Sequence, residues 1–260
     1  MTNASGELLL DREDTIAVLT LNRPSAGNSL TPGLILELGE ALASLRDDPG
    51  TSVIVITGSG DRAFCAGTDL RGGPDQTSFE DQFGPTPQHL SRGMKIWKPV
   101  IAAINGYAIG GGFELALSCD LRYAASSASF ALPEVRLGTM PGAGGTQRLV
   151  RQAPFAIAME VLLLGERWDA TRIRDAGLLN GIFEPEELLE GVLAIARRVA
   201  QNAPLSTKAI KQAVTRGAHL ELGEALELER TLFNMLRDTE DRREGRAAFA
   251  EKREPKFRGR

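Results

Sequence analysis

The segment from residue 98 to residue 120, KPVIAAINGYAIGGGFELALSCD, constrains the fold more than any other part of the chain. It opens with an apolar run, Val100 to Ile104, bounded by a proline and an Asn-Gly pair. A short run of aliphatic and β-branched residues between such signals predicts an interior strand. Three glycines, Gly110 to Gly112, then precede an apolar segment that contains one acid, Glu114, and predicts a short buried helix. The segment therefore indicates a strand–turn–helix unit with glycine at the turn.

Two glycine turns follow predicted interior strands. The first is Gly67-Thr68, downstream of the apolar run Val53 to Thr57, and the second is Gly110 to Gly112. Glycine leaves backbone N–H groups uncovered, and the first N–H groups of a helix have no partner within the helix. Two such groups that converge on one oxygen would form an oxyanion hole for enolate or acyl chemistry. The alternative is that the glycines only allow the turns to pack closely, because isolated glycine patterns are weak evidence.

Two acids stand in apolar surroundings. Glu114 lies in the first turn of the predicted helix, and Glu134 follows Pro133. A buried carboxylate needs a partner or a function. Two carboxylates around one pocket would raise the pKa of at least one of them and allow general acid and base catalysis. The alternatives are that Glu114 complements the helix dipole and that Glu134 forms a salt bridge with Arg136 or Arg122.

The two halves of the chain differ in pattern. Strand and helix patterns alternate in the first half, with a hairpin around residues 12–14 and a helix from about Pro32 to Arg46, and this alternation predicts an α/β fold. The leucines of that helix are spaced to form one buried stripe, namely Leu34, Leu38, Leu42 and Leu45. From Pro154 onward the pattern is mostly helical. The polar stretch from Arg71 to Gly93 has no clean periodicity, and we interpret it as a loop or short helices over a site.

Composition argues against several classes of protein. A net charge of −4 and a pI near 5.4 give no support for nucleic acid or an anionic membrane as the main partner. The acidic N-terminus and the lack of any apolar run near the roughly 20 residues of a membrane span predict a cytoplasmic protein without a signal peptide. Cys65 and Cys119 have no metal-ligand spacing. We expect His89 and His219 to be packing or surface residues and Lys98 to lie on the solvated surface.

Five segments together resemble the enoyl-CoA hydratase/isomerase (crotonase) superfamily, and within it the hydratases. They are LNRPSAGNSL at 21–30, AFCAGTDL at 63–70, KPVIAAINGYAIGGGFELALSCD at 98–120, LPEVRLGTMPGAGGTQRL at 132–149 and DRREGRAAFAEKREPKF at 241–257. They run nearly end to end in the family's order. The resemblance implies an α/β fold, a superhelix of repeated ββα units, with a catalytic core over 1–200 and a C-terminal helical trimerisation region over 201–260. Homotrimers, or homohexamers built as dimers of trimers, are implied as well.

The resemblance also implies the residues of the site. The N–H groups of Thr68 and Gly111 would hold a thioester oxygen, and Glu114 and Glu134 would hold one water molecule. The substrate-binding residues that it implies are Arg23, Ala26, Ala66, Thr68, Asp69, Leu70, Arg71, Gly111, Phe233 and Lys252. The last two would reach coenzyme A bound to the same or an adjacent subunit.

The implied reaction is syn addition of water to a 2-enoyl-CoA, giving a 3-hydroxyacyl-CoA, in acyl-CoA metabolism such as fatty-acid β-oxidation. One glutamate would remove a proton from water, the other would protonate Cα, and enolate charge would gather on the thioester oxygen. The resemblance implies neither a metal nor a redox cofactor, because coenzyme A enters as part of the substrate.

Two alternatives remain open. The first is an isomerase or another CoA-thioester enolate enzyme of the same superfamily. Isomerases commonly keep only the second glutamate, whereas this chain has both, and dienoyl-CoA isomerases carry a further acid where this chain has Gly142. The second alternative is a binding or RNA-associated relative without catalysis, against which the acidic balance and the two glutamates argue. Short fatty, branched, terpenoid and carnitine-like acyl groups all remain candidates.

Overall fold

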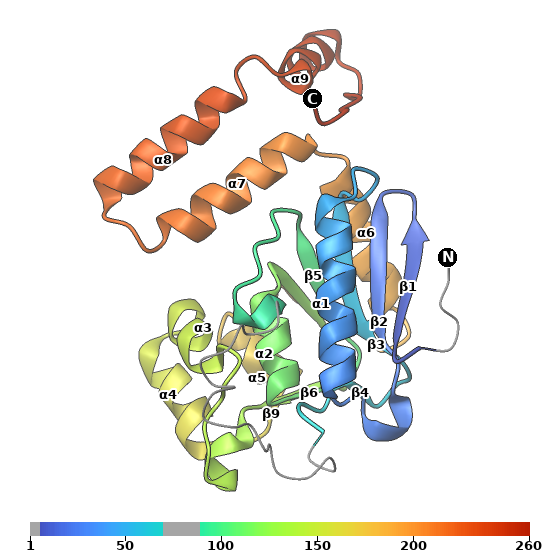
Figure 1. The fold of residues 1–260 in the computed structure, drawn as a ribbon, viewed down its shortest axis with the longest axis vertical. Helices are drawn as coiled ribbons and strands as arrows, with labels where there is room; N and C mark the ends of the chain where they lie inside the picture. The colour runs from blue at the N-terminus through green and yellow to red at the C-terminus, as the bar shows by residue number, and fades with distance from the viewer. Residues whose placement is uncertain (1–5, 70–88) are drawn as a thin grey trace.

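A computed structural model describes residues 6–69 and 89–260 of the 260-residue chain. Two sheets with helices packed around them form the core, and the last three helices of the chain extend beyond one end of it (Figure 1). The mixture of parallel sheets and helices confirms the predicted α/β class.

The larger sheet has six strands in the order β1-β2-β3-β5-β7-β10. These strands are β1 (Leu8–Glu13), β2 (Ile16–Leu21), β3 (Val53–Gly58), β5 (Val100–Ile104), β7 (Leu121–Ala125) and β10 (Gly181–Phe183). The hairpin of β1 and β2 is antiparallel, and every other neighbouring pair in this sheet is parallel. β3 and β5 are buried along their whole length, which explains why both have continuous apolar sequences.

The smaller sheet, in the order β4-β6-β8-β9, gathers the turns that matter for the site. Its strands are β4 (Ala63–Cys65), β6 (Tyr107–Ile109), β8 (Ser129–Ala131) and β9 (Trp168–Asp169). β4, β6 and β8 run parallel, with Cys65 paired to Ala108 and Ile109 paired to Ala131. Because parallel strands end at the same edge of a sheet, the turns that follow these three strands lie side by side. Successive ββα units therefore bring residues near 67, 110 and 134 to one place.

The helix α1 (Pro32–Asp47) shows how the local sequence sets an element. Thr31 caps its N-terminus by accepting a hydrogen bond from the Leu34 N–H at 3.0 Å, and a proline begins the first turn. Leu34, Leu38, Leu42 and Leu45 form the buried stripe that the sequence predicts.

The other helices follow the sheets in chain order. The α-helices are α2 (Gly111–Ser118), α3 (Gly145–Gln152), α4 (Phe155–Leu164), α5 (Ala170–Asp175), α6 (Leu188–Ala200), α7 (Pro204–Gly217), α8 (Leu222–Met235) and α9 (Glu240–Glu251). The short 3-10 helices are η1 (Pro24–Ala26), η3 (Leu90–Arg92) and η4 (Pro133–Leu137). The part of the predicted loop that the structure describes, residues 89–93, contains η3, and residues 71–88 lie outside the described ranges.

Lys98 is buried, so the prediction that it lies on the solvated surface is wrong. Its Nζ atom donates hydrogen bonds to the carbonyl oxygen of Leu45, at 2.6 Å, and to that of Asp48. Both carbonyls belong to the C-terminal end of α1, where backbone oxygens lack partners within the helix. The lysine therefore supplies hydrogen-bond donors to the C-terminal carbonyls of α1 and connects this helix to the start of β5.

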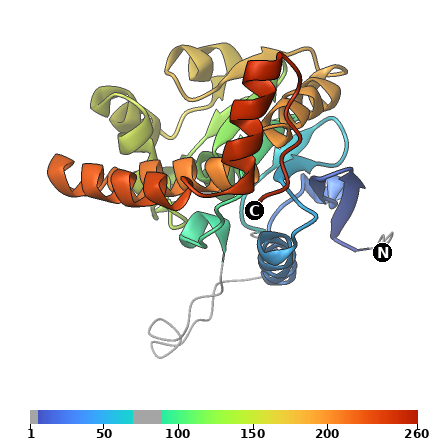
Figure 2. The same cartoon turned by 90° about the horizontal axis from the view of Figure 1, so that it is seen from above.

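The C-terminal helices are joined to the core by a second lysine. Lys211 on α7 donates to the Lys98 carbonyl oxygen at 2.8 Å and forms an ion pair of 2.6 Å with Asp120, whose carboxylate also accepts from the Val100 N–H. Figure 1 shows α7, α8 and α9 beyond the end of the larger sheet, and Figure 2 shows α9 and the C-terminal tail crossing above it. The domain boundary near residue 200 stays a prediction. Within the two described ranges, no helix is both long and apolar enough to span a membrane.

Candidate active site

The backbone amides of Thr68 and Gly111 lie next to each other. A β-carbon built on Gly111 would be 3.9 Å from the Thr68 nitrogen, and one built on Gly67 would be 3.3 Å from the Gly111 nitrogen. Neither amide donates a hydrogen bond to any residue of the described ranges. Gly111 is the first residue of α2, so its N–H also stands at the positive end of a helix. Two neighbouring N–H donors without partners suit an oxygen that develops negative charge.

Gly67 can be only glycine in this turn. Its φ angle is +89°, and a β-carbon at this position would lie 2.8 Å from the Ile109 carbonyl oxygen. The turn is held in place by its neighbours, since the Gly67 carbonyl oxygen accepts from the Leu30 N–H at 2.8 Å and the Asp69 N–H donates to the Leu30 carbonyl oxygen at 3.0 Å. The Thr68 N–H is thus left available between two fixed peptide groups.

Glu114 is buried and is held by a second helix. Its Oε1 atom accepts hydrogen bonds from the N–H groups of Ala143 and Gly145, both at 2.7 Å. Gly145 begins α3, so the carboxylate lies at the N-terminus of that helix while its own residue stands in the first turn of α2. Both backbone donors bind Oε1, and Oε2 has no hydrogen-bond partner in the described ranges, so Oε2 is left to meet a ligand.

Glu134 lies beside the N-terminus of α2 in a different electrostatic setting. A β-carbon at Gly110 would come within 2.9 Å of its Oε1 atom, and its Oε2 atom is buried without a hydrogen-bond partner in the described ranges. Neither proposed salt bridge forms there, because Arg136 pairs with Glu166 and Arg122 donates to backbone carbonyls. Burial, followed by the charge of Glu114, raises the pKa of Glu134.

The raised pKa of Glu134 predicts a pH-dependent stability difference. The folded protein binds the proton more tightly than the unfolded chain, so this stabilisation is complete below the ordinary value of 4.5 and is lost as the pH rises through the folded pKa. The Gln side chain stays neutral at every pH, so the Glu134→Gln variant does not lose stability in this way. We therefore expect Glu134→Gln to become more stable than the wild type as the pH rises above 4.5, by about 1 kcal/mol because the side chain is only half buried.

Urea unfolding at several pH values from acid to neutral measures this difference. The exposed Glu37→Gln is the matched control, because it makes the same chemical change at a solvent-exposed residue of α1. A stability difference between Glu134→Gln and the wild type that stays flat with pH would contradict the electrostatic account of Glu134.

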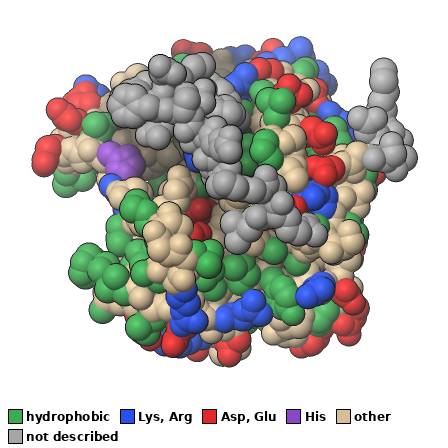
Figure 3. All heavy atoms as spheres, turned by 60° about the horizontal axis from the view of Figure 1, so that its bottom comes forward, with side chains coloured by type: hydrophobic (Ala, Val, Ile, Leu, Met, Phe, Trp, Pro, Cys, Tyr) green, Lys and Arg blue, Asp and Glu red, His purple; other side chains and the backbone are tan. Residues whose placement is uncertain are grey.

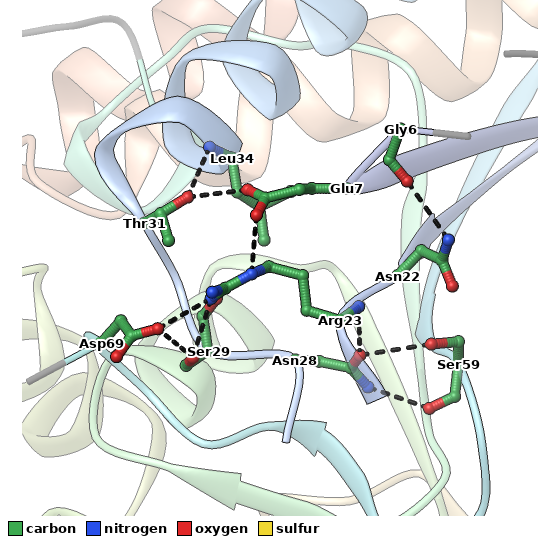
Figure 4. Close-up of polar contacts among 10 residues, drawn as sticks. All are labelled: Gly6, Glu7, Asn22, Arg23, Asn28, Ser29, Thr31, Leu34, Ser59 and Asp69. Atoms are coloured by element: carbon green, nitrogen blue, oxygen red, sulfur yellow. Dashed lines mark hydrogen bonds and ion pairs between the residues drawn. The ribbon is translucent and has the colours of Figure 1, made fainter. Parts of the chain in front are cut away.

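Arg23 sits in a network of carboxylates and hydroxyl groups (Figure 4). Its guanidinium pairs with Glu7 at 2.8 Å and with Asp69 at 3.0 Å, and it donates to the backbone and side-chain oxygens of Ser29. Arg23 and Ala26 also line a surface cavity of about 430 Å³. The network links the β2–α1 connection to the residue after Thr68, so Arg23 supports the Gly67-Thr68 turn. Its predicted contact with coenzyme A stays a prediction.

The structure brings together some of the expected substrate-binding residues and not others. Ala66 and Asp69 flank the Gly67-Thr68 turn, whereas Leu70 and Arg71 lie outside the described residues. Phe233 and Lys252 belong to α8 and to the C-terminal end of α9, two helices that extend beyond one end of the core, whereas α2 lies within the core (Figure 1). Phe233 lines a cavity of about 520 Å³ with other aromatic side chains of this region. Within one chain, these two residues are therefore remote from the paired glutamates.

Sequence reasoning missed the residues that hold Glu114. In the sequence, residues 143–149 contributed to the family resemblance, and the turn before Gly145, where α3 begins, was not singled out. Ala143 and Gly145 supply backbone groups, so their side chains give no chemical signal, and the only hint was the glycine-rich turn itself. Arg148, in the same segment, was not singled out although its guanidinium reaches the turn.

The histidines behave as packing and surface residues, as predicted. His89 is buried and its Nδ1 atom accepts from the Ser91 N–H at 3.1 Å, while His219 is exposed. Burial, aided by the nearby charges of Arg92 and Arg148, lowers the pKa of His89 to about 4. The ring is therefore neutral near pH 7. Both cysteine thiols are buried, and burial raises the pKa of each to about 12.

Comparison with known proteins identifies the family of this chain. The model of the enoyl-CoA hydratase/isomerase family matches residues 11–260. The chain is 44% identical over 251 residues to (E)-benzylidenesuccinyl-CoA hydratase of Thauera aromatica, covering 96% of this chain and 98% of that protein. It is 42% identical over 254 residues to 2,3-dehydroadipyl-CoA hydratase of Escherichia coli K12, covering 98% of this chain and 99% of that protein.

Solved structures are similar as well. The crystal structure of enoyl-CoA hydratase from Bacillus anthracis superposes with a TM-score of 0.91 at 35% identity, covering 98% of this chain and all of that one. A second, from Geobacillus kaustophilus, has a TM-score of 0.91 at 39% identity, with 98% and 99% of the two chains covered. Sequence and structure lead to the same conclusion: the chain belongs to the enoyl-CoA hydratase/isomerase family.

Proposed function

We propose that the protein is an enoyl-CoA hydratase that adds water to the double bond of a 2-enoyl-CoA thioester and yields a 3-hydroxyacyl-CoA. The observation that carries the proposal is the meeting of two backbone amides, at Thr68 and Gly111, with two carboxylates, at Glu114 and Glu134, around the N-terminus of α2. Neither amide has a hydrogen-bond partner among the described residues. Relatives that are 37–44% identical carry hydratase names, which supports the same reaction class.

Glu114 is proposed as the base. Its Oε1 atom is fixed by two N–H donors, a partner set that matches an acceptor-only carboxylate, and Oε2 is left to take a proton from water. Because the carboxylate is anchored at one oxygen, water bound to the other is positioned before the reaction begins.

Glu134 is proposed as the acid. Burial and the charge of Glu114 raise its pKa, so it holds a proton more readily than an ordinary glutamate and can deliver it to Cα. Enolate charge on the thioester oxygen would be stabilised by the Thr68 and Gly111 N–H groups. After the addition, Glu114 holds the proton taken from water and Glu134 has lost its own, so a proton must pass from Glu114 to Glu134, directly or through solvent, before the next turnover. That the reaction needs no metal and no redox cofactor remains a prediction.

A hydration assay with a panel of 2-enoyl-CoA thioesters tests this proposal. Crotonyl-CoA, 2,3-dehydroadipyl-CoA and (E)-benzylidenesuccinyl-CoA form the panel, with the 3-hydroxyacyl-CoA product measured by mass spectrometry. We expect hydration of at least one of them. Rapid conversion of a 3-enoyl-CoA into a 2-enoyl-CoA with negligible hydration would favour an isomerase instead, because a double-bond shift needs proton transfer but no added water.

An oligomer built through the C-terminal helices is also proposed. Large apolar side chains stand exposed on this region, namely Ile210, Val214, Leu222, Leu226, Phe233, Met235 and Phe249. Phe249 is 88% exposed. A concentration of exposed apolar surface on one region favours an interface between protein chains. A trimer, or a hexamer made of two trimers, would cover it.

Sedimentation velocity tests this assembly. We expect the wild type to sediment as a trimer or hexamer and Phe249→Asp to shift toward smaller species, because burying an unpaired carboxylate costs several kilocalories per mole, about 3 or more. Leu36→Asp on α1 is the matched control, since it makes the same kind of change at an exposed apolar residue of the core. A monomeric wild type would reject the proposal.

A second exposed apolar surface lies on the core. It consists of Leu137, Met140, Phe155, Leu163 and Leu164. Hydrophobic side chains gather on the left of Figure 3, on the side where Figure 1 places α3 and α4. This surface adjoins η4, which carries Glu134. It gives a hexamer a second place of contact beside the C-terminal helices, and a Phe155→Asp variant that still forms trimers but not hexamers would support that arrangement.

A further inference from the structure

Arg148 occupies a position that ordinarily disfavours a cation. It is the fourth residue of α3 (Gly145–Gln152), in the first turn, where the positive end of the helix dipole opposes positive charge. Its guanidinium is partly buried, and burial lowers its pKa. No carboxylate of the described ranges forms an ion pair with it, although the charge of Glu114 favours its protonated form. An arginine that stands against the helix dipole, with no ion pair in the described ranges to offset it, indicates a role other than stabilising its own helix.

The guanidinium of Arg148 instead joins three backbone carbonyl groups. Its Nη1 atom donates to Ser91 at 2.6 Å and to Ala143 at 3.0 Å, and its Nη2 atom donates to Leu90 at 3.4 Å. Leu90 and Ser91 belong to η3, which packs on α2, and Ala143 belongs to the turn before α3. Arg148 therefore links three elements that surround Glu114.

Arg148 contacts the same turn, at residues 143–145, whose backbone N–H groups bind Glu114. Ala143 donates its N–H to Glu114 at 2.7 Å and accepts from Arg148 through its carbonyl oxygen. Gly145, two residues on, supplies the second N–H. The position of the two donors thus depends on the contact between the guanidinium and residue 143.

The conformation of Gly144 fits the same arrangement. Its φ angle is +101°, and a β-carbon there would lie 1.9 Å from Arg148 Nη1. The guanidinium fills the space that any other side chain at residue 144 would need. The guanidinium therefore lies directly against this turn, and glycine at residue 144 leaves room for it.

We propose that Arg148 is a positioning residue for Glu114, which fixes the turn at residues 143–145 so that its two N–H groups hold the carboxylate in the geometry that activates water. This inference rests on the proposed hydratase function for its kinetic part alone. Arginine suits the role better than lysine, because its planar fork presents several donors in fixed directions, whereas an ammonium group is a single point charge.

Steady-state kinetics of Arg148→Ala and Arg148→Lys test the catalytic side of the proposal. Misplacing a reacting group by about 1 Å costs on the order of 100-fold in rate, so we expect kcat of Arg148→Ala to fall about 100-fold while KM changes little. The kcat of Arg148→Lys should fall by a smaller factor. Millimolar guanidinium should restore part of the activity of Arg148→Ala by refilling the vacated space, and it should not raise the activity of the wild type.

Arg151→Ala is the matched control, because Arg151 lies on the same helix, is exposed and, among the described residues, forms hydrogen bonds only with Gln147 of that helix. We expect the Arg151→Ala variant to have the same kcat as the wild type, whether or not guanidinium is added. A merely structural role for Arg148 predicts a different result: active-site titration would show a smaller folded fraction with normal kcat per folded molecule, and guanidinium would not help. That result, or an unchanged kcat in Arg148→Ala, overturns the proposal.

A crystal structure of Arg148→Ala gives a readout that does not depend on activity. We expect the turn at residues 143–145 to shift and at least one of the two N–H contacts with Glu114 Oε1 to be lost. If both contacts persist at 2.7 Å, the positioning role is rejected, whatever reaction the protein catalyses. If the wild type hydrates no enoyl-CoA but the turn moves in the variant, only the proposed function fails.

Discussion

Glu114→Gln should lower kcat for enoyl-CoA hydration about a thousandfold while leaving KM nearly unchanged, because a positioned general base contributes about 10² to 10⁴ in rate. The amide oxygen of Gln can still accept from the Ala143 and Gly145 N–H groups, so the fold and the shape of the site are kept. What is lost is the ability to take a proton from water. A thousandfold decrease corresponds to about 4 kcal/mol of transition-state stabilisation.

Steady-state kinetics, with circular dichroism to establish folding, measures this effect. Glu134→Gln should lose activity to a similar degree, since its amide cannot deliver the proton to Cα. The double variant should be little slower than either single variant, because residues that act as one unit give non-additive losses. If Glu114→Gln hydrates crotonyl-CoA as fast as the wild type does, Glu114 is not the base.

Thr68→Pro should reduce kcat about 10² to 10³-fold, the loss observed when one donor of an oxyanion hole is removed. Proline has no backbone N–H, and among the described residues the Thr68 N–H has no structural partner. The contacts that hold the turn in place are made by Gly67 and Asp69 to Leu30, and they do not involve the Thr68 nitrogen. The substitution therefore removes the donor and none of the hydrogen bonds that hold the turn.

Thr68→Ala is the control for this prediction. It keeps the N–H and removes only the exposed side chain, so near wild-type kcat is expected. A large loss in Thr68→Ala would assign the effect to the threonine side chain. Normal activity in a folded Thr68→Pro would remove Thr68 from the oxyanion site.

Both predictions rest on polar groups that the fold orients before substrate arrives. The N-terminus of α2 presents the Gly111 N–H, and the N-terminus of α3 presents the Gly145 N–H to Glu114. Groups that are fixed in advance need no reorganisation during the reaction, which is the main source of their catalytic effect. Glycine occurs at both helix starts, where backbone must approach backbone or ligand closely.

The sequence was sufficient for the elements with strong local patterns. Continuous apolar runs at Val53 and Val100 predicted interior strands, and leucines at helical spacing predicted α1 and its buried face. These predictions succeeded because period and length are properties of adjacent residues. The two glutamates and the two glycine turns were also visible as candidate groups, although their pairing came from resemblance to a family.

Local pattern failed where a residue's partner is distant in the chain. Lysine is usually a surface residue, yet the amine of Lys98 donates hydrogen bonds to carbonyl oxygens at the C-terminal end of α1, about 50 residues earlier in the chain. Likewise, Glu134 could have paired with a nearby arginine, and only the folded structure shows that both candidate arginines bind elsewhere.

By itself the sequence determined which groups are present: two acids in apolar segments, glycines at two turns and strands long enough to be buried. Only the tertiary structure decided which of them meet. Parallel pairing of β4, β6 and β8 brings three separate turns to one sheet edge, and the turn before α3 then closes on Glu114 through backbone N–H groups. The physical reason is that backbone dipoles carry no residue-specific signal, so their direction is fixed only when the chain around them has folded.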